Sequence, residues 1–205
     1  SIEKEKLQDE YFNCLKLELK QKLKNIQKDY DVTTIYIGGG TPSFIDSMYI
    51  QELLNLIQCN KKNMEITIEI NPGTASKKKL IDYREAGINR LSIGLQSTHN
   101  SLLQKIGRIH TYKQFLDTYK LARNIGFNNI NVDLMLGLPS QNVDDLKQSL
   151  KEVIELKPEH ISVYSLILEE GTKLYDLVQN GHSFLPNEET ERQMYWYTKS
   201  TLELN

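Results

Sequence analysis

VTTIYIGGGTP, residues 32–42, decides the fold class of this chain. Val32 to Ile37 is a short apolar run rich in β-branched residues, and three glycines followed by Thr41 and Pro42 close it. An apolar run that stops at a glycine-rich loop is typical of a buried parallel strand that meets the loop leading to a helix. We therefore predict a strand over residues 32–37.

The same unit repeats along the chain. Further β-rich runs predict strands over residues 65–70, 90–95, 130–136 and 160–167. The segments that follow the first four strands predict helices over residues 46–58, 76–86, 112–124 and 143–156. Strict alternation of strand and helix demands parallel strands joined by right-handed crossovers and covered by helices. The predicted fold class is therefore α/β.

Small or polar residues stand just past several of these strands: Gly38 to Thr41, Glu69, Asn71, Gln96, Ser97 and Gly137. An open sheet binds its ligand at one switch point, whereas a barrel uses the carboxyl ends of many strands. Both architectures suit the alternation, and the spread of these residues favours the barrel. We predict a partial (βα) barrel of parallel strands with outer helices.

Both ends of the chain predict an incomplete barrel. A helix over residues 3–30 opens the chain, where a fold of this kind places a strand before its first helix. A further helix over residues 187–204 runs to the carboxyl end. We expect the first strand and the C-terminal region to be missing. The partial barrel then covers residues 1–180, and residues 181–205 begin a truncated C-terminal region.

Composition excludes several classes of protein. The 25 Lys and Arg residues against 27 Asp and Glu give a net charge of -2, and the basic residues are scattered, which argues against nucleic-acid binding. No apolar run approaches the roughly 20 residues that cross a bilayer. The opening SIEKEKLQDE lacks the apolar core of a signal peptide. We expect a cytoplasmic protein that is not integrated in a membrane.

The cysteines, the histidines and Trp196 show no spacing that indicates a metal, cofactor or catalytic site. Cys14 and Cys59 lie far apart without a CxxC spacing, so they indicate neither a disulfide framework nor a metal centre. Trp196, within MYWY at 194–197, is interpreted as an aromatic residue packed on an amphipathic helix. Four histidines show no ligand spacing and are interpreted as structural: His99, His110, His160 and His182.

Polar groups at the strand ends are candidates for ligand binding. Gly38 to Gly40 let backbone groups approach a ligand, or simply form a tight turn. Glu69 interrupts an apolar strand, so it either faces solvent or holds ammonium or hydroxyl groups of a ligand. The amide of Gln96 both donates and accepts, which suits a pair of ribose hydroxyls or a barrel interior satisfied by the backbone.

Asp133 and Arg108 complete the candidates. Asp133 lies within the apolar run INVDLML, and a buried carboxylate needs nearby donors because its desolvation is costly. We take a functional role as the better reason for its presence there. Arg108 follows Gly107 and could hold a carboxylate through two N–H bonds, although a lone arginine is usually on the surface.

Six motifs occur in order: GGGTP (38–42), IEINP (68–72), GLQS (94–97), IGRIH (106–110), DLMLGLP (133–139) and SVYSLILEEGT (162–172). With them the chain resembles the radical S-adenosylmethionine (SAM) family of oxygen-independent coproporphyrinogen III oxidase and its relatives. The resemblance covers roughly residues 33–200. It implies a TIM-barrel-like radical SAM fold that binds SAM and a 4Fe-4S cluster.

The resemblance also implies a role for each candidate residue. Gly39, Gly40 and Thr41 would hold the methionine amino end of SAM, and Glu69 would lie in the same pocket.

Gln96 and Asp133 would then bond the ribose, and Arg108 would bond the methionine carboxylate. Met135 and Ile167 would line the adenine with backbone and apolar surface.

EEGT followed by LPNEETERQMY resembles the haem-chaperone (HemW-like) branch of the family. Both branches need a CxxxCxxC motif, whose three thiolates hold the cluster, and the chaperone branch also carries a C-terminal HNxxYW. Neither motif occurs in this sequence, so the cluster ligands are absent from this chain. Cys14 and Cys59 cannot replace three thiolates on one loop. Activity of this fragment alone is therefore not expected.

Three hypotheses follow. The intact protein is a haem chaperone, with haem or another tetrapyrrole as its ligand and with an unknown haem acceptor and electron donor. Alternatively, it is an oxygen-independent coproporphyrinogen III oxidase that decarboxylates its substrate to protoporphyrinogen IX. The third hypothesis is a non-catalytic barrel fragment. An exposed edge at residues 32–37 further predicts that the fragment self-associates.

Overall fold

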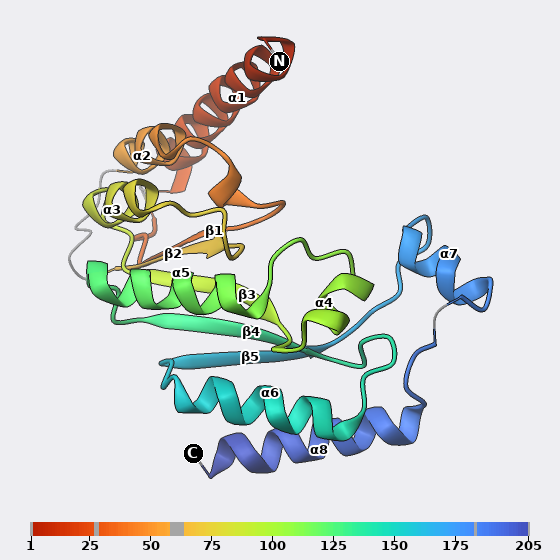
Figure 1. Ribbon diagram of the computed structural model, residues 1–205. Helices are drawn as coiled ribbons and strands as arrows, with labels where there is room; N and C mark the ends of the chain where they lie inside the picture. Colours follow the sequence, from red (N-terminus) through yellow and green to blue (C-terminus); the bar gives the residue numbers. More distant parts are fainter. Residues whose placement is uncertain (1, 27–28, 58–63, 183, 205) are drawn as a thin grey trace.

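The computed structural model describes residues 2–26, 29–57, 64–182 and 184–204, so Cys59 lies outside the described residues. Within these ranges one sheet contains five strands: β1 (Thr34–Ile37), β2 (Glu65–Ile70), β3 (Arg90–Gln96), β4 (Ile130–Leu136) and β5 (His160–Ser165). Neighbouring strands are parallel and follow one another in chain order. This is the arrangement of a barrel wall, and it confirms the predicted α/β half-barrel (Figure 1).

The helices of the described ranges alternate with these strands and confirm the predicted helices, with the ends moved by a few residues. They are α1 (Ile2–Ile26), α2 (Ser47–Leu56), α3 (Lys77–Glu85), α4 (Asn100–Lys105), α5 (Tyr112–Ile125), α6 (Val143–Glu155), α7 (Lys173–Gln179) and α8 (Glu188–Glu203). A short 3-10 helix, η1 (Pro42–Phe44), follows the glycine loop. The sequence did not predict α4 and α7.

Local sequence signals set the ends of the longer helices. Thr111 and Gln114 form a capping box at the start of α5, and Asn142 and Asp145 form another at the start of α6. Such caps satisfy backbone N–H groups that the first helical turn leaves free. The helix α5 ends at Gly126 with a φ of 101°, the left-handed stop that glycine adopts without strain.

The core lies between the sheet and the helices that cover its outer face. Alternate residues of the central strands point to this face, because side chains on a strand alternate in direction. The fully buried ones are Ile66 and Ile68 of β2, Leu91, Ile93 and Leu95 of β3, and Ile130, Val132 and Leu134 of β4. From the helices and their connections, Leu80, Tyr83, Phe115 and Phe127 pack against them without solvent exposure. In the apolar runs that predicted these strands, the side chains on the helix-covered face of the sheet are thus buried.

The helix α8 corrects the interpretation of Trp196. Met194 is buried and Thr198 is nearly so, while the Trp196 side chain is 55% exposed and Tyr195 is equally exposed. Residues four apart share one face of a helix, and the face of α8 that carries Met194 and Thr198 packs against α6 and β4. The aromatic residues between these two positions therefore lie on the outward face. The placement of residue 180 as a domain boundary stays a prediction.

We expect the 205-residue chain to self-associate through β1. In the described part of the chain β1 pairs only with β2, so its other edge presents unpaired backbone groups. Analytical ultracentrifugation over a range of concentrations should show association, and Thr34→Lys should weaken it because a charged side chain on an edge strand opposes pairing. Gln193→Lys on α8 adds the same charge elsewhere and should have no effect. A monomer at high concentration would contradict the prediction.

Candidate functional site

The polar face of the half-barrel carries the predicted strand residues. The strand positions that alternate with the core residues point away from the helices, and many are polar: Tyr36, Glu69, Ser92, Gln96, Asn131, Asp133, Ser162 and Tyr164. In the ladder Glu69 lies beside Ser92, and Gly94 lies beside Asp133. Because parallel strands end at one edge, residues far apart in the sequence are brought together there.

The glycine loop closes one end of this face. Gly39 and Gly40 have φ angles of 83° and 59°, and a Cβ added at either would meet no atom within 4 Å. Their backbone therefore borders open space. Glu69 holds the loop, because its Oε2 accepts the Gly39 N–H at 3.3 Å and its Oε1 accepts the Tyr36 hydroxyl at 2.9 Å. A Cβ on Gly38 would lie 2.9 Å from Glu69 Oε1, so only glycine fits unless that side chain moves.

Asn71 joins the glycine loop to Arg108. Its Nδ2 donates to Thr41 Oγ1 at 3.0 Å, and its Oδ1 accepts from Arg108 Nη1 at 3.1 Å. Arg108 is half-buried, and its bond to Asn71 places it beside the glycine loop. Within the described residues, its guanidinium makes this one hydrogen bond, which leaves further N–H donors for a carboxylate.

Gln96 ends β3 in an unusual conformation. The pairing of β3 with β4 shifts between Gly94 and Gln96, and Gln96 has a φ of 72°, a region that residues other than glycine seldom adopt. Its buried side chain lies on the polar face, where Oε1 accepts the Tyr164 hydroxyl at 2.9 Å. The amide nitrogen makes no hydrogen bond to the described residues, so it remains a donor for a ligand.

Asp133 lies at the centre of the polar face. Its Oδ1 accepts from Asn131 Nδ2 at 2.6 Å, and the Ser92 hydroxyl lies 3.3 to 3.4 Å from both carboxylate oxygens. Burial raises the pKa of the Asp133 carboxyl, and the hydrogen bonds from Asn131 and Ser92 partly offset that rise. Oδ2 receives only the long bond from Ser92 within the described residues, so it can accept a stronger donor.

Met135 and Ile167 lie at the same edge of the sheet. Met135 is half-buried two residues beyond Asp133, hence on the same face, and its backbone oxygen accepts from Gln141 Nε2 at 3.2 Å. Ile167 follows β5 and is 78% exposed. The Leu166 N–H donates to the Leu136 oxygen at 3.0 Å, so pairing with β4 continues to the residue before Ile167.

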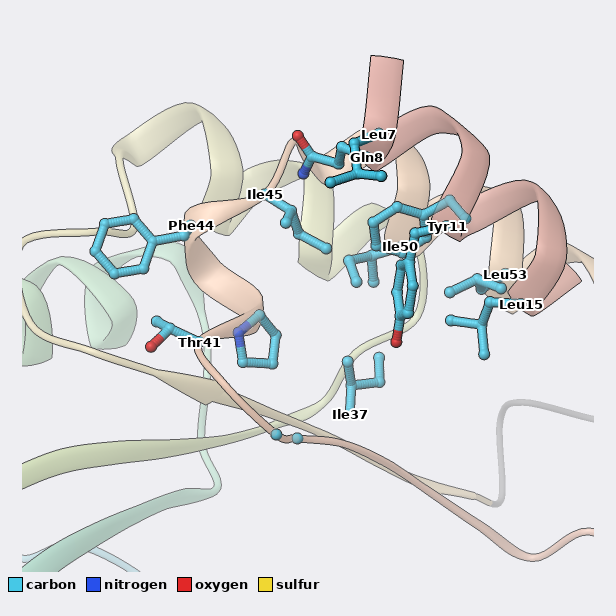
Figure 2. Close-up of a pocket in the computed structure, with 14 residues that line it drawn as sticks. Leu7, Gln8, Tyr11, Leu15, Ile37, Thr41, Phe44, Ile45, Ile50 and Leu53 are labelled. Carbon is cyan, nitrogen blue, oxygen red and sulfur yellow. The ribbon is translucent and has the colours of Figure 1, made fainter. Parts of the chain in front are cut away.

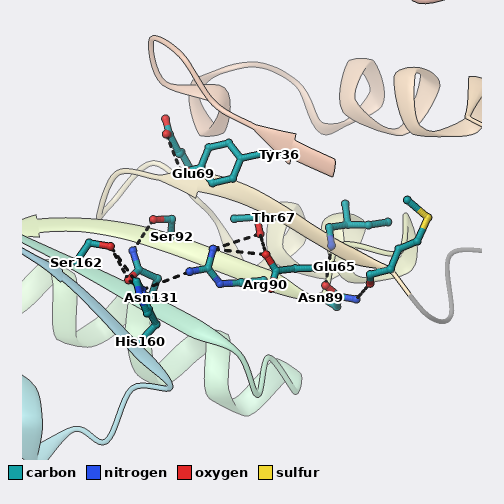
Figure 3. A network of polar contacts seen from close by, with 12 residues as sticks. Tyr36, Glu65, Thr67, Glu69, Asn89, Arg90, Ser92, Asn131, His160 and Ser162 are labelled. Carbon is teal, nitrogen blue, oxygen red and sulfur yellow. Dashed lines mark hydrogen bonds and ion pairs between the residues drawn. The ribbon is translucent and has the colours of Figure 1, made fainter. Parts of the chain in front are cut away.

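A second set of polar contacts continues toward the amino ends of the strands (Figure 3). Arg90 Nη1 donates to Thr67 Oγ1 at 3.4 Å and lies 3.9 Å from Glu65 Oε1. Its Nη2 lies 3.5 Å from His160 Nδ1, and His160 in turn contacts the side-chain oxygen of Asn131. These contacts tie four neighbouring strands together across the polar face.

From the sequence, Asn71 had been noted only as a polar residue past its strand, and three further residues of this face had not been singled out: Ser92, Asn131 and Tyr164. A signal for two of them was present, because Ser92 lies two positions before Gly94 and Asn131 two before Asp133, the spacing that places strand residues on one face. His110 has the structural role expected of it, since it is buried and its Nε2 lies 3.2 Å from the Leu95 oxygen.

An apolar pocket of about 860 Å³ lies beside the glycine loop, between α1 and the segment from β1 to α2. Figure 2 shows residues that line it, with Tyr11 and Leu15 on α1 and Ile37 and Ile50 on the segment from β1 to α2. Its lining residues in the described part of the chain carry no charged side chain. It therefore does not suit a charged ligand, in contrast to the polar face that Glu69 and its neighbours line.

The described residues contain no group of three His, Cys, Asp or Glu side chains that could hold a metal ion. Cys14 is exposed on α1. No helix among the described residues is both long and apolar enough to cross a membrane.

Comparison of the sequence with protein families gives a match to the radical SAM superfamily over residues 15–153. The chain is 41% identical over 199 residues to the haem chaperone HemW of Bacillus subtilis, covering 95% of this chain and 52% of that protein. It is 36% identical to the mitochondrial radical S-adenosyl methionine domain-containing protein 1 of Danio rerio, covering 91% of this chain and 43% of that protein. The chain thus spans about half the length of these relatives.

Among solved structures, the fold is similar to coproporphyrinogen III oxidase (HemN) of Escherichia coli, which is described as a radical SAM enzyme. The TM-score is 0.75 at 26% identity, and the match covers 91% of this chain and 44% of that one. The archaeal Elp3 of Methanocaldococcus infernus has a TM-score of 0.73 at 22% identity, with 90% and 49% covered, which is a likeness of fold alone.

Proposed function

This chain is a member of the radical SAM superfamily, and from that membership we propose that the polar face of its half-barrel binds SAM. The observation that carries the proposal is the convergence of acceptors and donors at one edge of the sheet. SAM presents an ammonium, a carboxylate, a ribose diol and an adenine. The face offers a partner for each of these groups.

The methionine amino end would lie at the glycine loop. Gly39 and Gly40 leave space above their backbone, and Thr41 follows them. Glu69 supplies the negative charge that an ammonium needs, in a position fixed by its bonds to the loop and to Tyr36.

Gln96 and Asp133 would bond the ribose. The free nitrogen of Gln96 donates, while Oδ2 of Asp133 accepts, so together they match a pair of hydroxyls. Arg108 would bond the methionine carboxylate, because its remaining N–H groups suit a planar acceptor. Met135 and Ile167 would flank the adenine.

The family also implies a 4Fe-4S cluster, which supplies an electron to bound SAM. Such a cluster needs three converging thiolates. The described residues do not offer them, since Cys14 is alone on α1, and the sequence lacks the family's CxxxCxxC. The roles proposed for the side chains above concern SAM binding and do not depend on the cluster.

For the full-length protein we propose haem chaperoning, with haem as ligand and with a haem acceptor and an electron donor as partners. The likeness to a bacterial haem chaperone along almost the whole of this chain supports it. A second candidate, oxidation of coproporphyrinogen III, is supported by the likeness to the solved structure of that oxidase.

Two anaerobic measurements on the full-length protein test this choice. Titration with haem, followed by its absorbance, should show saturable binding. Incubation with coproporphyrinogen III, SAM and a reductant should form no protoporphyrinogen IX. Turnover to protoporphyrinogen IX would establish the oxidase instead, and absence of haem binding would overturn the chaperone proposal.

A further inference from the structure

We propose that Asn131 is a positioning residue for SAM: it holds the Asp133 carboxylate charged and in one orientation, ready for the ribose. This inference rests on the proposed function. Asn131 is 2% exposed and lies on the same face of β4, two residues before Asp133. A buried amide with four bonding positions needs several partners, and those of Asn131 define its role.

The donor side of the amide points at the carboxylate. Asn131 Nδ2 is 2.6 Å from Asp133 Oδ1 and 2.8 Å from Ser92 Oγ. The Ser92 hydroxyl uses its own proton toward Asp133. The three side chains thus form a closed triangle, in which the bond that Asn131 donates to Ser92 polarises the bond that Ser92 donates to Asp133.

The acceptor side of the amide fixes its direction. Asn131 Oδ1 accepts the Ser162 hydroxyl at 3.0 Å and also contacts His160 Nδ1 (Figure 3). If the amide were reversed, its NH₂ would face these groups and its oxygen would face the carboxylate, which has no donor when charged. In this orientation Asn131 Oδ1 can accept a hydrogen bond from Nδ1 of His160 when that nitrogen carries a proton.

Other ionisable groups also act on Asp133, so the effect of Asn131 must be separated from theirs. The negative charge of Glu69 on β2 raises the pKa of Asp133, and the positive charge of Arg90 on β3 lowers it. Burial raises the pKa of the hydroxyls of Tyr36 and Tyr164, and the negative charge of Asp133 adds to that rise. His160 on β5 faces the same side. Unlike Glu69 and Arg90, Asn131 donates a hydrogen bond to Asp133, which favours its charged form.

Removal of Asn131 should therefore change how SAM affinity depends on pH. In Asn131→Ala the carboxylate loses its shortest donor, so it takes up a proton at a higher pH and rotates more freely. By isothermal titration on the full-length protein, we expect SAM affinity to fall about tenfold near neutral pH. The pH below which affinity is lost should move upward.

Asn131→Asp distinguishes positioning from packing, because it keeps the shape of the side chain while replacing the donor by an acceptor. Two carboxylates in contact cannot both be charged at low cost. The pH below which SAM affinity is lost should therefore be higher still than in the alanine variant. Ser92→Ala removes the weaker donor and should shift the profile in the same direction by less. Asn128→Ala, in the exposed turn before the same strand, is the matched control.

The outcomes separate this inference from the proposed function. If wild type binds SAM and Asp133→Asn weakens it, but both Asn131 variants and Ser92→Ala keep the wild-type pH profile, the positioning role is wrong and the site stands. If Asp133→Asn binds as wild type does, both fail. Circular dichroism checks each fold, and if Asn131→Ala does not fold, Asn131→Asp and Ser92→Ala carry the test.

Discussion

In the full-length protein, Asp133→Asn is expected to weaken SAM binding by about tenfold or more, because the ribose loses a charged acceptor worth about 1 to 3 kcal/mol. Arg108→Ala should cost at least as much, since it removes a charge-assisted bond to the methionine carboxylate. Isothermal titration with SAM measures both.

The pH dependence of SAM binding tests whether Asp133 binds the ribose in its charged form. In the proposed site a charged carboxylate accepts from the ribose, so wild-type affinity should fall as the pH decreases through the pKa of Asp133, which burial has raised. Asp133→Asn should lack this acid-side loss. Asp144→Asn and Arg192→Ala, on the exposed surfaces of α6 and α8, are the matched controls and should bind as wild type does. Wild-type binding by both site variants would show that the site has been assigned to the wrong residues.

Phe127→Ala is expected to lower the free energy of unfolding by about 3 to 5 kcal/mol, the usual range for a buried phenylalanine. Phe127 has no solvent exposure and packs in the core cluster, and the Arg84 guanidinium lies 5.6 Å from the centre of its ring. A domain is typically stable by only about 5 to 15 kcal/mol, so much of the stability should disappear. Urea unfolding followed by far-UV circular dichroism measures the change.

Phe44→Ala is the matched control for this substitution. The side chain of Phe44 is 61% exposed, so its removal should change the free energy of unfolding by less than about 0.5 kcal/mol. Equal losses for the two variants would mean that the sheet and its covering helices are not packed as described.

The strands could be predicted from the sequence because their outer residues are apolar without interruption. Such a run predicts a buried parallel strand from local sequence alone, as with Ile66 and Ile68 in β2 or Leu91 and Ile93 in β3. The short helices gave no such signal. The helix α7 buries none of its residues, and α4 has six residues, too few to show a helical period.

More of the candidate site residues than of their hydrogen-bond partners could be named from the sequence. Glu69, Gln96 and Asp133 stand out because each breaks or ends an apolar run. Asn71 accepts a hydrogen bond from Arg108, which comes from a different segment of the chain, and that contact depends on where α4 ends. Ser92 and Asn131 meet only through the register of β3 and β4, which the sequence does not state.

A crystal structure of the full-length protein with SAM bound tests the central claim most directly. We predict the ribose hydroxyls within hydrogen-bond distance of Asp133 and Gln96, with the methionine end between the Gly39–Thr41 loop and Arg108. SAM bound in the apolar pocket under α1, or on the helix-covered face of the sheet, would contradict the account.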